Sequence, residues 1–155
     1  MNVTIRNRDI WSTRPGQQTP MLAAFDELSR LQVGRLASLK MRRIARVIQQ
    51  QAEDIESERQ RILETFGERD KEGNLLEDED GPKVKQEGRD AFRELVSKGA
   101  FEVEALLASE IHKLDDILPW VLIGLGDLFH DDVSASENGN TPKQDAAAKR
   151  QARRR

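Results

Sequence analysis

The 155-residue sequence has no cysteine, no tyrosine and only two histidines. The lack of cysteine excludes disulfide cross-links, thiol catalysis and thiolate zinc sites, and it suits a reducing compartment. No apolar stretch approaches the roughly 20 residues that a membrane-spanning helix needs, and the first residues lack the apolar core of a signal peptide. Few groups suit acid–base or nucleophilic chemistry. We therefore expect no enzyme, with no catalytic residues, cofactor or metal.

Apolar residues are also scarce, at 37% of the chain, with a mean hydropathy of −0.70. Such a chain can bury one modest core. The net charge of −3 hides an asymmetry, because residues 143–155 hold six basic residues and one acidic residue. We therefore expect one acidic, helix-rich domain over residues 1–129 and a disordered tail with a basic end over residues 130–155.

Hydrophobic periodicity predicts an α+β fold that is predominantly helical. Alternating apolar residues predict short strands at residues 2–6 and 101–106, which would form a minimal sheet. Thr19 followed by Pro20 is typical of a helix start and predicts a helix over residues 20–31. A short helix is expected over residues 86–97. The acidic stretch before it, rich in turn signals, is expected to form a hairpin-like loop.

The clearest element is a predicted long central helix over residues 35–66, which contains no proline or glycine. It would span about 48 Å at 1.5 Å per residue. One apolar row follows the seven-residue spacing of a coiled coil: Met41, Ile48, Ile55 and Ile62. The partner row turns polar after Ile44, so this seam is too narrow for strong self-association. We expect the helix to pack on other elements near its start and to be more solvated later.

An apolar stretch, residues 117–129, closes the predicted domain. Pro119 suits a first helical turn, and apolar side chains would cover nearly the whole circumference of the helix, so it must be buried on most sides. One interpretation is a central core helix. The other is that one side meets a partner or a second subunit. In that case the partner-binding residues are Trp120, Leu122, Leu125 and Phe129.

Two groups of residues bear on metal binding. Oxygen-bearing side chains alternate from Asp70 onward, as in a calcium-binding EF-hand loop. Leu75, however, stands where that loop needs glycine, and Gly81 where it needs glutamate, so a solvated turn is favoured. His112 and His130 lack the spacing of a helical two-histidine site. Even with the aspartates beside them, we do not expect them to form a metal site.

The basic end of the tail has two interpretations. It is either a flexible appendage or a sequence-independent contact to nucleic-acid phosphates. No aromatic residue lies nearby to stack on bases, so base readout is not expected. The candidate nucleic-acid-binding residues are Lys149, Arg150, Arg153, Arg154 and Arg155.

The order of these features resembles a family of small proteins of unknown function from tailed bacteriophages and prophages. The likeness rests on an MNVTIRN-type strand, a helix carrying IARVIQQQAEDIESERQRILETFGE, the turn ERDKEGNLLEDEDG and an FEVEAL-type strand. It covers roughly residues 1–130 and is most specific from Ile44 to Gly73. The arginine-rich tail and the loop at residues 14–18 are not part of the pattern.

The resemblance implies a viral source and a non-enzymatic role, and it carries no catalytic residues. We expect a bacteriophage accessory or virion-assembly protein that binds other phage or host proteins, or a second copy of itself, in the host cytoplasm or the virion, with no membrane association. The alternative is a nucleic-acid-associated or host-regulatory phage protein that uses the basic tail.

Overall fold

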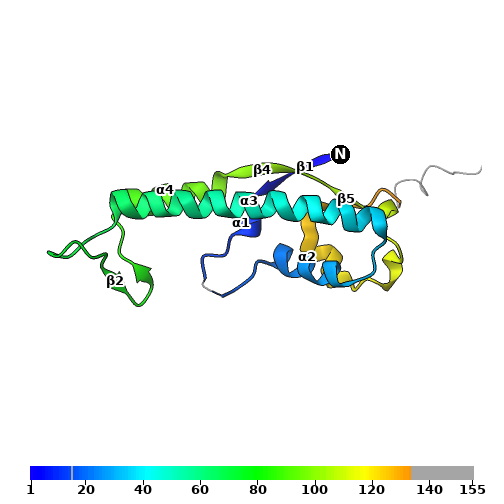
Figure 1. Ribbon diagram of the computed structural model, residues 1–155, viewed down its shortest axis with the longest axis horizontal. Helices are drawn as coiled ribbons and strands as arrows, with labels where there is room; N and C mark the ends of the chain where they lie inside the picture. Colours follow the sequence, from blue (N-terminus) through cyan, green and yellow to red (C-terminus); the bar gives the residue numbers. More distant parts are fainter. Residues whose placement is uncertain (15, 134–155) are drawn as a thin grey trace, which may run out of the picture.

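The computed structural model describes residues 1–14 and 16–133 of the chain. Helices predominate, and the molecule is elongated along one long helix (Figure 1). The strands are β1 (Asn2–Arg6), β2 (Glu77–Asp78), β3 (Gly81–Pro82), β4 (Ala100–Glu104), β5 (Leu106–Leu107) and β6 (Phe129–His130). The α-helices are α1 (Asn7–Ile10), α2 (Pro20–Arg30), α3 (Arg35–Phe66), α4 (Gln86–Lys98) and α5 (Pro119–Leu125). Short 3₁₀ turns are η1 (Ala108–Glu110), η2 (Leu114–Asp116) and η3 (Gly126–Leu128).

The long helix α3 has the predicted bounds and is 32 residues long. It begins after Gly34, whose φ of 93° suits glycine, and it ends at Gly67. The predicted apolar row is buried along its whole length, from Met41 at 5% exposure to Ile62 at 7%. The expectation of a more solvated second half is therefore wrong for this face. Helix α4 packs on that half, and Gly88 allows the close approach, since a Cβ there would lie 2.6 Å from the Cβ of Phe66.

The sheet that joins the N-terminal strand to the segment after α4 is small. Strands β1 and β4 pair antiparallel, with Val3 opposite Val103 and Ile5 opposite Phe101. The predicted strand over residues 101–106 divides, because β5 leaves this sheet and pairs parallel with β6. Leu106 thereby faces Phe129 across the second pair. The predicted minimal sheet is confirmed for residues 2–6 and 101–104, and the last predicted residues belong to a different pairing.

The apolar stretch at residues 117–129 does not form one helix. The α-helix α5 covers only Pro119–Leu125, because Gly126 adopts a φ of 53° that side-chain-bearing residues rarely adopt. A 3₁₀ turn and strand β6 follow. The chain continues in contact with the domain past residue 129, since the Asp132 carboxylate accepts hydrogen bonds from the backbone N–H and the hydroxyl of Ser109. The predicted domain end therefore falls inside β6.

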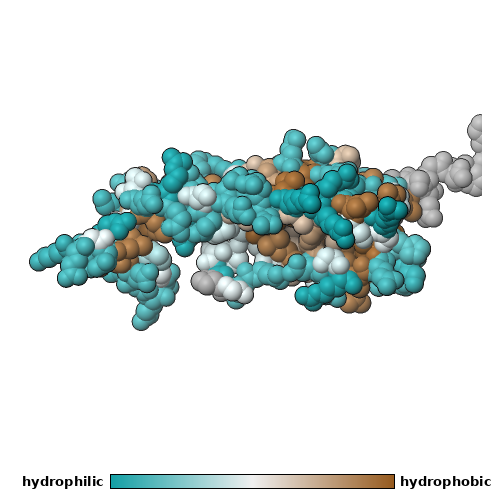
Figure 2. Space-filling view, viewed as in Figure 1, coloured by the Kyte–Doolittle hydropathy of each residue, from teal (hydrophilic) through white to brown (hydrophobic). Residues whose placement is uncertain are grey.

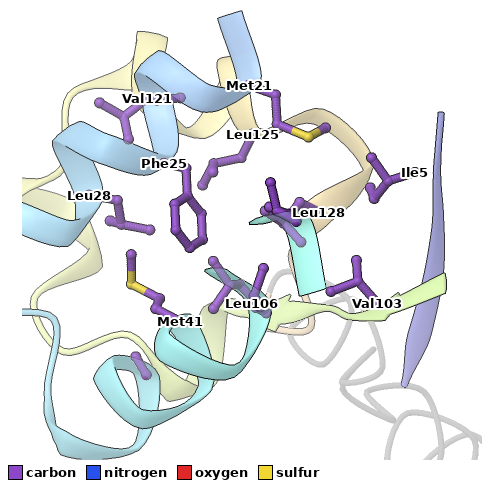
Figure 3. Close-up of a cluster of buried hydrophobic side chains, with 14 of the residues drawn as sticks. Ile5, Met21, Phe25, Leu28, Met41, Val103, Leu106, Val121, Leu125 and Leu128 are labelled. Carbon is purple, nitrogen blue, oxygen red and sulfur yellow. The ribbon is translucent and has the colours of Figure 1, made fainter. Parts of the chain in front are cut away.

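Most of the core lies around the N-terminal half of α3. Helices α2 and α5 pack on each other, and their side chains meet those of α3, β4 and β5 (Figure 3). Leu28, Leu106, Val121, Leu125 and Leu128 are fully buried there. The N-terminus of α2 is capped as predicted, because the Thr19 hydroxyl accepts a hydrogen bond from the N–H of Leu22.

Lys40 is a buried charge at the edge of this core. Its side chain is only 7% exposed, and its ammonium group donates to the Glu110 carboxylate and to the carbonyl oxygen of Ala105 at 3.1 Å. Glu104 lies 3.6 Å from the same nitrogen and 3.2 Å from the exposed Arg43. Lys40 therefore ties α3 to the segment that joins β4, β5 and η1.

We predict that Lys40→Ala lowers the free energy of unfolding by about 2–3 kcal/mol, because it leaves partly buried carboxylates without their cation. The matched control is Arg43→Ala, which removes an exposed cation from the same Glu104 and should cost less than about 1 kcal/mol. Urea unfolding followed by circular dichroism measures both. Equal effects of the two substitutions would contradict a special role for the buried ammonium group.

The acidic loop between α3 and α4 forms two short antiparallel pairings, as the turn signals predict. A bridge joins Arg69 to Leu75, and β2 pairs with β3. The Asp70 carboxylate accepts hydrogen bonds from the N–H groups of Glu72 and Asn74, both at 2.9 Å. It therefore organises the turn itself, as the solvated-turn interpretation expects.

These hydrogen bonds, first the one from the Asn74 backbone, hold the pKa of Asp70 below its ordinary value of 3.8. A lowered folded-state pKa stabilises the turn above the ordinary pKa, and this stabilisation is lost as the pH falls through the lowered value. We predict that NMR shows the Asn74 amide losing its hydrogen-bonded shift in acid, below pH 3.8. Asp70→Asn should abolish that titration step. An Asn74 amide insensitive to pH in the natural chain would contradict the assignment.

Candidate protein-binding surface

Helix α5 is covered on one side only. Its inner face, Val121 and Leu125, is fully buried. Three large apolar side chains at its start and outer face remain in solvent: Leu118 at 56%, Trp120 at 49% and Ile123 at 78% exposure. We call these three residues the α5 patch. Figure 2 shows apolar surface at the lower edge of the molecule, over the region of α2 and α5.

The orientation of α5 follows from one close approach. A Cβ on Gly124 would lie 2.7 Å from the Cβ of Ala24 and 3.1 Å from the carbonyl oxygen of Pro20. Glycine at this position therefore lets α5 lie directly against α2. Val121, Gly124 and Leu125 share the packed side of the helix, so Ile123, on the opposite side, is directed to solvent.

The α5 backbone is held at both ends. Leu118 precedes the helix in an extended conformation, and Pro119 occupies its first turn, where the missing N–H costs no hydrogen bond. At the other end the N–H of Gly126 donates to the carbonyl of Ile123. The α5 patch thus sits on a short, fixed element that is packed on the core.

The four predicted partner-binding residues divide between surface and core. Trp120 is exposed. Leu122 and Phe129 are partly buried and pack against the core, and Leu125 is fully buried. Leu125 is therefore not available at the surface, and Leu118 and Ile123 take the exposed positions. The signal that identifies Ile123 is Gly124 beside it, which marks the side of α5 that faces another backbone.

The other residues that the sequence suggested as metal ligands or nucleic-acid contacts do not form a site in the described part of the chain. His112 and His130 are both exposed, and within residues 1–14 and 16–133 no group of three histidine, aspartate or glutamate residues could hold a metal ion. Asp132 has its pKa lowered chiefly by the Ser109 hydroxyl and then by the Ser109 N–H, so its carboxylate is engaged in closing the fold. Lys149, Arg150, Arg153, Arg154 and Arg155 lie outside the described residues.

A groove lies at the end of the molecule away from the α5 patch. An open groove of about 500 Å³ separates the segment after α1 from α4 and the second half of α3. Its walls include Trp11, Ile62 and Phe92, and Arg59 and Arg89 lie among its charged residues. Arg59 pairs with Glu56, and Arg89 donates to the carbonyl of Val84. Both arginines are thus engaged with neighbouring residues.

No family model, curated protein or solved structure matches this chain. None of the helices in the described ranges is long and apolar enough to span a membrane.

We predict that Gly124→Val lowers the free energy of unfolding by about 2 kcal/mol, because its side chain collides with Ala24 and the Pro20 carbonyl. The matched control is Ile123→Val at the adjacent exposed position, which should change stability by less than about 0.5 kcal/mol. Thermal unfolding of the two variants compares their stabilities with that of the natural chain. If Gly124→Val were as stable as the control, the close packing of α5 on α2 would be wrong.

Proposed function

We propose that this protein acts without catalysis, by binding another protein through the α5 patch. The observation that carries the proposal is the exposure of Leu118, Trp120 and Ile123 within six residues on a helix whose opposite face is fully buried. The rest of the chain is strongly polar. A cluster of large exposed apolar side chains beside a packed helix is typical of an interaction site.

The chemistry of the patch suits a protein partner. Tryptophan is enriched among residues that dominate binding energy, because it buries a large area and loses little conformational freedom. Ile123 and Leu118 add aliphatic surface on either side of Trp120 without any charged group between them in the sequence. A complementary apolar pocket or helix groove would bury all three together.

The cellular setting of the proposal comes from the resemblance to proteins of tailed bacteriophages. It makes the chain an accessory or virion-assembly protein that meets phage or host proteins in the host cytoplasm or the virion. The alternative function, nucleic-acid association, depends on the basic residues near the C-terminus, which lie outside the described part of the chain.

We predict that Trp120→Asp combined with Ile123→Asp abolishes partner binding and leaves the fold intact, because both side chains are exposed in the free protein. The matched control is Leu76→Asp on the acidic loop, at 38% exposure. Tagged variants are compared by quantitative capture from phage-infected cells, with circular dichroism confirming the fold. A set of captured proteins that is unchanged in the double variant would contradict the proposal.

A second readout reports on the patch directly. The chain has two tryptophans, Trp11 and Trp120, so Trp11→Phe leaves Trp120 as the sole emitter. Burial of its indole by a captured partner, once purified, should shift the fluorescence emission to shorter wavelength. An emission maximum that does not move when the partner binds would place the contact elsewhere.

A further inference from the structure

The outward face of α3 is charged in two blocks of opposite sign. Residues 35–52 hold five basic and no acidic residues, whereas residues 53–66 hold five acidic and two basic residues. Four of the basic residues are exposed, namely Arg35, Arg42, Arg43 and Arg46. Glu53, Asp54 and Glu64 are exposed on the second half. In Figure 2 this outward face of α3 runs along the molecule.

The exposed charges of both blocks lie on one broad face of α3, which we call the stripe; Arg35, Arg42, Arg46, Glu53 and Glu64 lie along its centre, and Arg43 and Asp54 lie at its edge. Arg46 and Glu53 are seven residues apart and Arg42 and Arg46 are four apart, which are spacings that share a helix face. The buried row of α3 occupies the opposite side, as the low exposure of Ile44, Ile48 and Ile55 shows. The stripe is therefore a continuous surface that residues 1–14 and 16–133 leave uncovered.

These charges are not neutralised within the molecule. In the described part of the chain, no ion pair joins a carboxylate to Arg35, Arg42 or Arg46. The carboxylates of Glu53 and Asp54 accept hydrogen bonds from the amides of the glutamines one turn earlier, at 3.1 and 3.0 Å. Among the exposed arginines of the first block, Arg43 has a carboxylate partner, Glu104.

Exposed apolar side chains accompany the basic block. Leu36 is 72% exposed, Leu39 46% and Val47 40%. A helix surface that alternates arginine with leucine or valine fits an occupant with acidic groups and with the aliphatic stems of long side chains, both of which the exposed Glu64 and Arg61 of a second α3 offer. A nucleic-acid backbone would leave the leucines in water and would meet the acidic block on the same stripe.

We propose that the outward face of α3 binds the same face of a second copy of this chain, with the two helices antiparallel. A two-fold axis near Gln50 places Arg46 of each copy opposite Asp54 of the other, and Leu36 and Leu39 beside the opposite copy's second half. Every contact is then made twice, as in any isologous dimer. The stripe is self-complementary only in this orientation, because parallel helices would set the basic blocks against each other.

The interaction is mainly between exposed charges, so it weakens with salt. At about 1 M ionic strength the Debye length is about 3 Å, and paired surface charges are largely screened. The dimer should therefore be strongest at low salt and dissociate as salt is added. Analytical ultracentrifugation over a range of protein and salt concentrations measures this dependence. A monomer at every concentration and salt level would overturn the proposal.

Charge reversal provides the decisive experiment. Arg42→Glu with Arg46→Glu makes the first block acidic, and Glu53→Arg with Asp54→Arg makes the second block basic. All four positions are exposed, so both double variants should fold. Each alone should dimerise at least tenfold more weakly than the natural chain. An equimolar mixture should form a heterodimer, because both reciprocal contacts between the two variants become attractive.

The control is Arg93→Glu with Lys98→Glu on α4, which makes the same change in net charge as Arg42→Glu with Arg46→Glu but at exposed positions off this stripe. It should dimerise like the natural chain. If either stripe variant still dimerises normally, or if the mixture stays monomeric, the proposal fails. It also fails if the protein is a monomer whose Arg42 and Arg46 are needed to bind a short duplex DNA.

Trp120→Asp with Ile123→Asp should leave dimerisation unchanged, so the two proposed surfaces are tested separately.

Discussion

The fold depends on covering one row of side chains on α3. The buried residues of that helix run from Ala37 to Ile62, and one small group of packed helices and strands is too short to cover all of them. The chain solves this by placing its main core, built from α2, α5 and the strand pairs, on the first half, and α1 and α4 on the second. The helix is therefore the element that joins the main core to the layer formed by α1 and α4.

Two buried polar residues set where those segments meet α3. Asn7 is 2% exposed; its amide nitrogen donates to the carbonyl of Leu95, and its amide oxygen accepts from Gln51. Asn7 thus meets the middle of α3, and Lys40 makes the equivalent connection to Glu110 and Ala105 near the N-terminal end of the helix. Because a buried polar group without partners is costly, each residue favours only the register in which its hydrogen bonds form. The apolar core alone would tolerate sliding along the helix axis.

The sequence predicted the elements whose signals are local. Gly34 and Gly67 bound α3, Thr19 caps α2, and the alternation in residues 2–6 forms β1. The failures required knowledge of contacts between distant segments. Strand β5 leaves the main sheet because β6, more than twenty residues later, offers it a partner. The buried Lys40 could not be foreseen, since its carboxylate partners come from a part of the chain some seventy residues away.

The candidate site was predictable only as a region. An apolar stretch around Trp120 is visible in the sequence, but which of its side chains are exposed depends on how α5 turns against α2. Gly126 shortens the helix, and Gly124 selects the side that packs, so Leu125 is buried and Ile123 exposed. Periodicity over thirteen apolar residues cannot reveal this, because every side of such a helix is apolar.

The two proposed surfaces have a joint consequence. Helix α5, which carries the α5 patch, lies beneath the N-terminal half of α3, and the acidic loop lies at the far end of α3 (Figure 1). Antiparallel pairing of two α3 helices therefore places the two α5 patches on either side of the two-fold axis, on opposite faces of the helix pair. A dimer of that shape holds two partner molecules apart and links them. Partners that are themselves multimeric would be bound with an avidity that neither patch has alone, provided that their spacing matches the separation of the two patches.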